Sequence, residues 1–296
     1  MNSNNPSSPS KSTRSILITV DVEDWFQVEN LRPVCPIESW EFCDVRVEEN
    51  TRKLLELFDR HSVQTTFFVL GWVAQRFPGL VREIKSKGHE IASHGYMHLM
   101  LNKVSDPRLR EFLYRSKSLL EDISGEPVLG YRAAGFSITR NLFNLLGELG
   151  FQYDSSYNSF RLNQRYGSVQ GMFPASCDNR LISANGIIEL PLSNLKINRF
   201  SMPWAGGGFF RFWPQPIFEW GVSRILRHEN HYIFYCHPWE FDPGQPRVNG
   251  IGAFSRFRHY LNLDKTLDRL NHFLVRYKEC KFLTCKQYIE SLDLAP

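Results

Sequence analysis

The stretch "SILITVDVEDWFQ", residues 15–27, decides the fold because it joins a strand-forming run directly to three carboxylates. Residues 16–20 are apolar or β-branched, so they predict a strand that is buried on both faces, as strands of parallel sheets are. Asp21, Glu23 and Asp24 follow at once. Acids at the end of a buried strand need partners, and we expect polar groups from neighbouring strands to meet them there.

Strands and helices alternate along the rest of the chain. The same patterning predicts further strands at 63–71, 89–95, 128–132, 151–153, 187–191, 232–237 and 281–285, and helices at 48–61, 78–88, 106–125, 139–149, 216–228 and 264–278. Such alternation is typical of a parallel sheet covered by helices. Seven or eight strand–helix units predict an α/β barrel, whose active site lies at the carboxyl ends of its strands. The long connections 158–180 and 198–216 are expected to be functional loops.

Composition excludes several classes of protein. A hydrophobic content of 42% predicts a folded globular chain, and 296 residues suit one domain, which we place at 15–296 after a flexible polar tail at 1–14. The net charge of +4 comes without a basic run, which argues against nucleic-acid binding. No apolar run reaches the roughly 18 residues of a membrane-spanning helix. Because the first residues also lack the apolar centre of a signal peptide, we expect a cytoplasmic protein.

Polar residues collect where the predicted strands end. Besides the three acids, the strand ends carry His94, His98, Arg132, Asp154 and His237. A single histidine or aspartate at such a position usually caps a loop, but their joint placement on one rim favours a site. His94 and His98 are four residues apart, so on a helical turn they would share a face and could bind one cation. A carboxylate from the first strand end would complete a two-histidine, one-carboxylate set.

Five segments carry a resemblance to a known family. In chain order they are "TVDVEDW", "SHGYMH", "GYRAAGFS", "YDSSYNS" and "FYCHPWEFD", and they resemble the motifs of the polysaccharide deacetylases of carbohydrate esterase family 4, the NodB-homology fold. The resemblance covers roughly residues 15–289. It is closest to the branch found in exopolysaccharide gene clusters, which is related to allantoinase-like and peptidoglycan deacetylases. Gly95 stands where serine or threonine is usual, and Ala134 where many relatives have proline.

The resemblance implies a distorted (β/α)7-8 barrel that hydrolyses the N-acetyl amide of an amino sugar, in a polysaccharide or its precursor, and releases acetate. Asp21 would be the general base. His94 and His98 would bind one divalent metal ion, expected to be Zn²⁺, with Co²⁺, Ni²⁺ or Fe²⁺ as alternatives. The third ligand would be Asp24, with Glu23 as the alternative carboxylate, since Val22 separates acids that are adjacent in typical members.

The remaining roles concern proton transfer. Arg132 would orient Asp21 through a charge-assisted hydrogen bond and keep it ionised. His237 would be the general acid that protonates the leaving amine, held charged by a nearby carboxylate. Asp154, Glu240 and Asp242 are the candidates for that carboxylate, and simple loop capping is the competing interpretation for the last two.

The substrate and its contacts can be expected in outline. Trp25 and Trp239 are candidates for stacking on sugar rings, and Arg211, in the glycine-rich stretch "AGGGFFRFWP", is a third substrate-binding candidate. We expect a carbohydrate substrate, no nucleic-acid partner and no integral membrane segment, while the oligomeric state stays open. The alternatives to a deacetylase are a cyclic-amide hydrolase of the allantoinase-like kind and a catalytically silent glycan-binding module.

Overall fold

A curled, mostly parallel sheet forms the centre of the molecule. The computed structural model describes residues 14–160, 182–198 and 200–292. Its main sheet has the strand order β10-β1-β2-β3-β4-β5-β7-β6, with β11 beside the start of β1, and β6 is antiparallel to β7 whereas the other neighbours are parallel. The strands are β1 (Ser15–Val22), β2 (Thr66–Val69), β3 (Glu90–Ser93), β4 (Gly130–Tyr131), β5 (Tyr153–Asp154), β6 (Ile182–Ala184), β7 (Ile187–Glu189), β10 (His231–Cys236) and β11 (Lys281–Phe282). The predicted α/β distorted barrel is confirmed as an open, curled sheet that ends in β10 on one side and β6 on the other.

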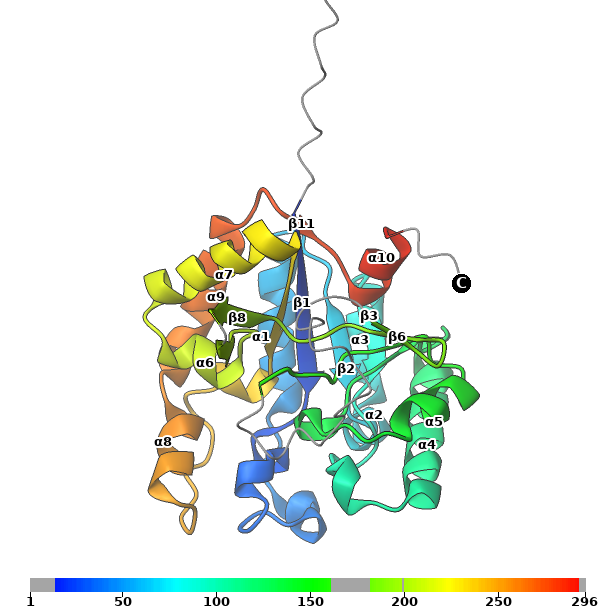
Figure 1. Ribbon diagram of the computed structural model, residues 1–296. Helices are drawn as coiled ribbons and strands as arrows, with labels where there is room; N and C mark the ends of the chain where they lie inside the picture. Colours follow the sequence, from blue (N-terminus) through cyan, green and yellow to red (C-terminus); the bar gives the residue numbers. More distant parts are fainter. Residues whose placement is uncertain (1–13, 161–181, 199, 293–296) are drawn as a thin grey trace, which may run out of the picture.

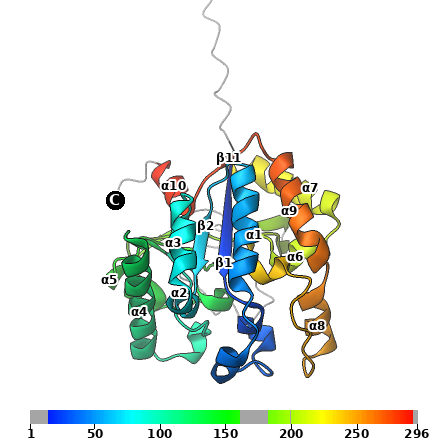
Figure 2. The same ribbon diagram turned by 180° about the vertical axis from the view of Figure 1, so that it is seen from behind.

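Helices surround this sheet on its outer side (Figures 1 and 2). The predicted helices are confirmed to within a few residues by α1 (Val47–Arg60), α3 (Pro78–Ser86), α4 (Asp106–Ser124), α5 (Leu142–Glu148), α7 (Gln215–Glu229) and α9 (Thr266–Arg276). The patterning missed the short helices α2 (Gly71–Arg76), α6 (Gly207–Phe212), α8 (Ala253–Tyr260) and α10 (Cys285–Glu290).

The two connections that were expected to be long loops have different outcomes. The connection at 198–216 contains the strand β9 (Phe200–Pro203) and the helix α6. Strand β9 pairs with β8 (Asn194–Ile197). Most of the one at 158–180 lies outside the described residues, as does nearly all of the expected polar tail. Within the part of the chain that the structure describes, none of the helices has both the length and the apolar character needed to cross a membrane.

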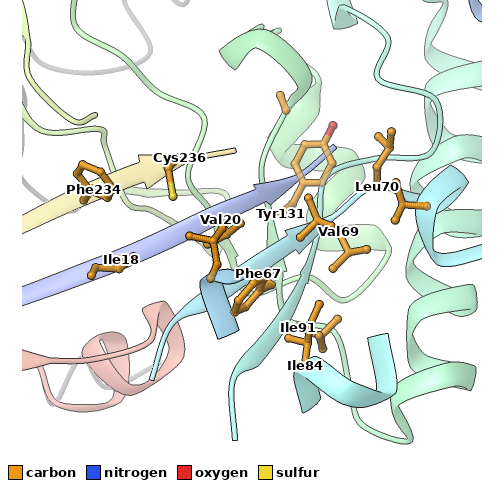
Figure 3. Close-up of a cluster of buried hydrophobic side chains, with 14 of the residues drawn as sticks. Ile18, Val20, Phe67, Val69, Leu70, Ile84, Ile91, Tyr131, Phe234 and Cys236 are labelled. Atoms are coloured by element: carbon orange, nitrogen blue, oxygen red, sulfur yellow. The ribbon is translucent and has the colours of Figure 1, made fainter. Parts of the chain in front are cut away.

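Side chains of β1 alternate between two cores. Ile18 and Val20 point to the outer core between sheet and helices, together with Phe67 and Val69 of β2 (Figure 3). Leu17 instead belongs to a smaller cluster inside the curl of the sheet. This two-residue period follows from strand geometry and buries both faces of β1.

The same period points Thr19 and then Asp21 toward the inside of the curl, because they share the parity of Leu17. Strands β1, β2 and β3 run in the same direction, so their carboxyl ends lie at one edge. In Figure 1 this edge is at the bottom, where the segment after β1 and helix α8 project. The acids after β1 therefore lie at the mouth of the curled sheet.

Candidate functional site

Asp21 and Arg132 form a buried ion pair at the mouth of the sheet. Arg132 Nη1 donates to Asp21 Oδ1 at 2.7 Å and to Thr19 Oγ1 at 2.7 Å. Its Nε donates to the carbonyl oxygen of Ser155 at 3.0 Å, and its Nη2 donates to the hydroxyl of the same residue at 2.9 Å. The guanidinium also lies over the ring of Phe68, with 4.1 Å from its carbon to the ring centroid. The hydrogen bond expected between Arg132 and Asp21 is present, and it holds one carboxylate oxygen of Asp21 in place and leaves Oδ2 available.

Glu23, His94 and His98 bring three possible metal-ligand atoms together. All three side chains are buried, and their ligand atoms lie within 4.8 Å of one another. Glu23 Oε2 lies 2.8 Å from His98 Nε2, and the two imidazole centroids are 5.4 Å apart. Two imidazole nitrogens and a carboxylate oxygen are a donor set that suits a divalent ion such as Zn²⁺.

The protonation of these groups also suits a cation. His94 Nδ1 lies 2.9 Å from the carbonyl oxygen of Arg132, so this nitrogen carries the proton and Nε2 keeps its lone pair. Burial lowers the pKa of His94 to about 4, which keeps the imidazole neutral at pH 7. Burial would raise the pKa of Glu23, but the neighbouring His98 and His237 hold it well below its usual range. The buried Nδ1 of His98 has no hydrogen-bonding partner among the described residues.

The loop between the two histidines differs from the prediction. Residues 94–98 form no helical turn; β3 ends at Ser93 and an irregular segment follows. Gly95 and His98 have positive φ angles of 76° and 48°, and these turns fold the segment back so that both imidazoles face one point. Glycine adopts such a conformation without strain, which gives a physical reason for Gly95 where the family usually has serine or threonine.

Asp24, expected as the third ligand, does not lie with the histidines, and the candidate set is corrected to the alternative, Glu23. Asp24 Oδ1 accepts from the backbone N–H of Trp25 at 2.8 Å, and Oδ2 accepts from those of Arg46 at 2.7 Å and Val47 at 2.9 Å. These contacts turn the carboxylate toward the start of α1. Strand parity explains the difference, because Glu23 continues the inward series of Asp21 whereas Asp24 has the opposite parity.

His237 follows β10 and is held by Glu240. Its Nδ1 lies 3.0 Å from Glu240 Oε2, and that oxygen also accepts from the backbone N–H of His237 at 3.0 Å. Its Nε2 lies 3.9 Å from Asp21 Oδ2 and 3.5 Å from Glu23 Oε1. Burial would lower the pKa of His237, but the surrounding carboxylates Glu23, Glu240 and Asp21 raise it to about 9.

The structure separates the three carboxylate candidates for His237. Asp242 pairs with Arg46 and accepts a hydrogen bond from Asn50 Nδ2 at 3.1 Å. These contacts stabilise the loop after His237, as the capping interpretation predicts. Asp154 accepts from the hydroxyl of Ser156 at 2.7 Å and lies opposite Glu189 in the sheet. Glu240 alone of the three contacts His237 within the described ranges.

The proposed base, the candidate metal ligands and the His237–Glu240 pair line one cavity of about 130 Å³ at the mouth of the sheet. Its wall includes Trp239 and Arg211, two of the expected substrate-binding residues, and the lining contains Asp21, Glu23, His94, His98, Met100, Phe136, Tyr235, His237, Glu240 and Arg258. Trp239 stacks on His237 at 5.3 Å, and its Nε1 donates to Glu23 Oε1 at 3.3 Å.

These surroundings correct the expected substrate contact of Trp25 and give Arg211 a second set of contacts. Trp25 packs edge-on against Phe26 in the core and donates its Nε1 to the carbonyl oxygen of Asp44 at 2.9 Å, so it does not lie at the cavity. Arg211 reaches the cavity wall, but its Nε donates to Glu240 Oε1 at 2.8 Å and its Nη1 donates to two backbone carbonyls. It therefore contacts the support of His237.

Sequence reasoning gave no role to several residues at the cavity, and His259 is the one that contacts the ring stack. His259, from the end of α8, stacks on Trp239 with 4.5 Å between centroids and an interplanar angle of 10°. No strand end marks it, because α8 was not predicted and its contact with Trp239 joins residues 20 positions apart across a loop.

Two families match successive halves of the chain. The polysaccharide deacetylase family matches residues 12–153, and a domain of unknown function (DUF3473) matches residues 155–290. Two peptidoglycan-N-acetylglucosamine deacetylases of Bacillus cereus are 36% identical over 77 residues and 33% identical over 102 residues. These alignments cover 26% and 34% of this chain, and 28% and 47% of the relatives, so less than half of either relative is spanned.

Solved structures share the fold along nearly the whole chain. A candidate polysaccharide deacetylase from Mycobacterium smegmatis has a TM-score of 0.64 at 20% identity, covering 100% of this chain and 96% of that one. An allantoinase has a TM-score of 0.57 at 17% identity, with 96% and 92% covered, and a family 4 pseudoenzyme from Bacillus anthracis has 0.51 at 12%, with 93% and 64% covered. At these identities the likeness shows the fold alone. Residues 12–153 thus match the polysaccharide deacetylase family, and the chain as a whole has the NodB-type fold of family 4 deacetylases.

Proposed function

We propose that this chain hydrolyses the N-acetyl amide of an amino sugar in a glycan and releases acetate, with a divalent metal ion as cofactor. One observation carries the proposal: a base held by an arginine, three candidate metal ligands and a histidine held by a carboxylate converge on one cavity. Amide hydrolysis needs these three elements, because water must be activated, the carbonyl polarised and the departing nitrogen protonated.

Each residue has a defined role in this proposal. Glu23, His94 and His98 would hold the ion, which when bound would polarise the amide carbonyl and lower the pKa of the attacking water. Asp21 accepts the proton of that water through Oδ2, since Arg132 occupies Oδ1. His237 donates a proton from Nε2 to the leaving nitrogen, on the opposite side of the attacked carbon.

The fold supports treating both halves of the chain as one catalytic unit, as expected for residues 15–296. Strand β5 ends the segment matched by the deacetylase family, and it pairs with β7 of the other segment. Strand β10, which leads to His237, pairs with β1, which leads to Asp21. The base and the proposed ligands thus come from the first segment and the acid from the second. On the strength of the sequence resemblance we further propose zinc as the natural metal and a place in exopolysaccharide synthesis. The cytoplasmic location remains an expectation from the sequence composition.

The test is acetate release from N-acetylated amino-sugar oligomers. Chelated protein should release none, and reconstitution with Zn²⁺, Co²⁺, Ni²⁺ or Fe²⁺ in turn should restore release and identify the metal. His94→Ala should remain inactive with every metal. His272→Ala is the matched control, because that histidine is exposed and lies 3.3 Å from Glu219, away from the cavity. Its activity should equal that of the unmodified chain.

Other outcomes would favour the alternatives. Glycan binding without acetate release under any metal would indicate a silent binding module. Ring opening of a cyclic amide that persists after chelation would indicate an allantoinase-like hydrolase. Either result would refute the deacetylase proposal.

A further inference from the structure

A buried ion pair lies directly behind the histidine at the cavity. Arg211 and Glu240 are 2% and 1% exposed, and Arg211 Nε donates to Glu240 Oε1 at 2.8 Å. The other oxygen, Oε2, accepts from the backbone N–H of His237 and lies 3.0 Å from its Nδ1. Each carboxylate oxygen therefore has its own partner, and the position of the carboxylate sets the orientation of the imidazole.

Arg211 is itself anchored by the end of α8 and the residues that follow it. Its Nη1 donates to the carbonyl oxygens of His259 at 2.9 Å and Leu261 at 2.8 Å. The carbonyl oxygen of Arg211 in turn accepts from Asn262 Nδ2 at 2.8 Å. A guanidinium has five donors in a rigid fork, so several simultaneous contacts define its position in a way that an ammonium cannot reproduce.

A stack of rings supports the same histidine from the side. His259 lies flat on Trp239, and Trp239 lies on His237 with an interplanar angle of 23°. Gln245 donates its amide N–H to the carbonyl oxygen of Trp239 at 2.8 Å, and its Oε1 lies 2.8 Å from His259 Nε2. The amide oxygen can only accept, so His259 donates from Nε2. The segment around α8 thus holds His237 through both the ion pair and the stack.

We propose that Arg211 is a positioning residue that acts through Glu240 to aim Nε2 of His237 at the leaving nitrogen of the substrate. This inference rests on the proposed deacetylase function. In that reaction a water oxygen bonds to the acetyl carbon and its proton goes to Asp21; the C–N bond then breaks while His237 delivers a proton to nitrogen, which leaves as the sugar amine beside acetate.

The inference predicts a dependence on the leaving group. An amine cannot leave as an anion and requires the aimed proton, whereas a nitrophenolate leaves from an aryl acetate without one. Disturbing Arg211 should therefore slow hydrolysis of the amide and spare hydrolysis of the ester, because Asp21 and the candidate metal ligands are untouched. A general loss of structure would slow both reactions together.

The test compares Arg211→Lys and Glu240→Gln on an N-acetylglucosamine oligomer and on 4-nitrophenyl acetate. We expect kcat for the amide to fall about 100-fold, the lower bound for general acid–base catalysis, with KM changed little and ester hydrolysis within about threefold of the unmodified chain. Arg269→Lys is the control, because Arg269 likewise donates to backbone carbonyls, those of Arg211 and Trp213, but is only partly buried and has no contact with Glu240 among the described residues. It should show no preference between the two substrates.

A second readout does not depend on turnover. In protein with ¹⁵N-labelled histidine, the Nδ1 proton of His237 should give a hydrogen-bonded resonance that is lost or shifted in Arg211→Lys and kept in Arg269→Lys. Equal losses on amide and ester, or an unchanged resonance in Arg211→Lys, would overturn the inference. If the unmodified chain releases no acetate, the deacetylase proposal fails, and the resonance still decides whether Arg211 positions His237.

Discussion

Replacing each of the two neighbouring acids after β1 by its amide should affect metal binding in one variant and folding stability in the other. We expect Glu23→Gln to weaken metal binding and Asp24→Asn to weaken folding, because Glu23 lies with His94 and His98 whereas Asp24 holds the start of α1. Both substitutions replace a buried carboxylate by an amide of the same size, so the pair is matched in volume and in charge.

The expected magnitude for Glu23→Gln follows from losing one of three ligands. We expect metal binding to weaken at least about 100-fold, which corresponds to about 2.7 kcal/mol. At a free metal concentration of 100 times the dissociation constant, the unmodified chain gains about 2.7 kcal/mol of stability from the ion, whereas the variant gains about 0.4 kcal/mol. At about 2–4 °C per kcal/mol, added metal should raise Tm by about 5–11 °C in the first and by about 1 °C in the second.

The expected magnitude for Asp24→Asn follows from its hydrogen bonds. An asparagine keeps one acceptor oxygen, so the backbone N–H groups of Arg46 and Val47 lose their shared partner, Oδ2. Each orphaned donor costs about 1–3 kcal/mol. Burial raises the pKa of Asp24 to about 6, so removing this buried charge offsets part of the loss. We expect a net loss of about 2 kcal/mol, or about 4–8 °C in Tm, and an undiminished rise of Tm on adding metal.

The assay is differential scanning fluorimetry of both variants with and without Zn²⁺, together with a zinc titration against a competing chelator. The reasoning would be refuted if Asp24→Asn abolished the metal-induced rise in Tm while Glu23→Gln kept it. Equal zinc affinities in all three proteins would refute the ligand set altogether.

Two further predictions concern stability. Burial, together with the charge of Asp154, raises the pKa of Glu189 well above its usual range. The folded chain therefore loses stability as the pH rises above the pKa of this residue in the unfolded chain, about 4.3, because the unfolded chain then releases a proton that the folded chain keeps. The Tm of Glu189→Gln should rise relative to that of the unmodified chain between pH 5 and pH 8, and a constant difference in Tm would contradict this. A Cβ on Gly221 would lie 2.2 Å from Nε1 of Trp204, so Gly221→Ala should lose about 1–3 kcal/mol in urea unfolding. The control Gly147→Ala, whose nearest contact would be 3.6 Å, should gain up to about 1 kcal/mol from helix propensity, and equal shifts would count against the packing argument.

Local patterns predicted the frame of this site. The alternation of strands and helices, and the positions where strands end, depend on neighbours in the chain, so they can be read without the structure. These patterns were enough to predict that one rim of the sheet carries a set of five residues, which the structure brings together: Asp21, Arg132, His94, His98 and His237. Strand parity could also have favoured Glu23 over Asp24, because it needs only the two-residue period of β1.

The partners of the side chains were decided by the tertiary structure. Arg211 was expected to bind substrate, and folding also brings it to Glu240, 29 residues away, and to the carbonyl of His259, 48 residues away. Trp25 was expected at the cavity and is turned into the core by its bond to Asp44. A strand end depends on local sequence, whereas a buried polar group takes whichever partner the packed elements bring within about 3 Å, and local sequence does not encode that choice.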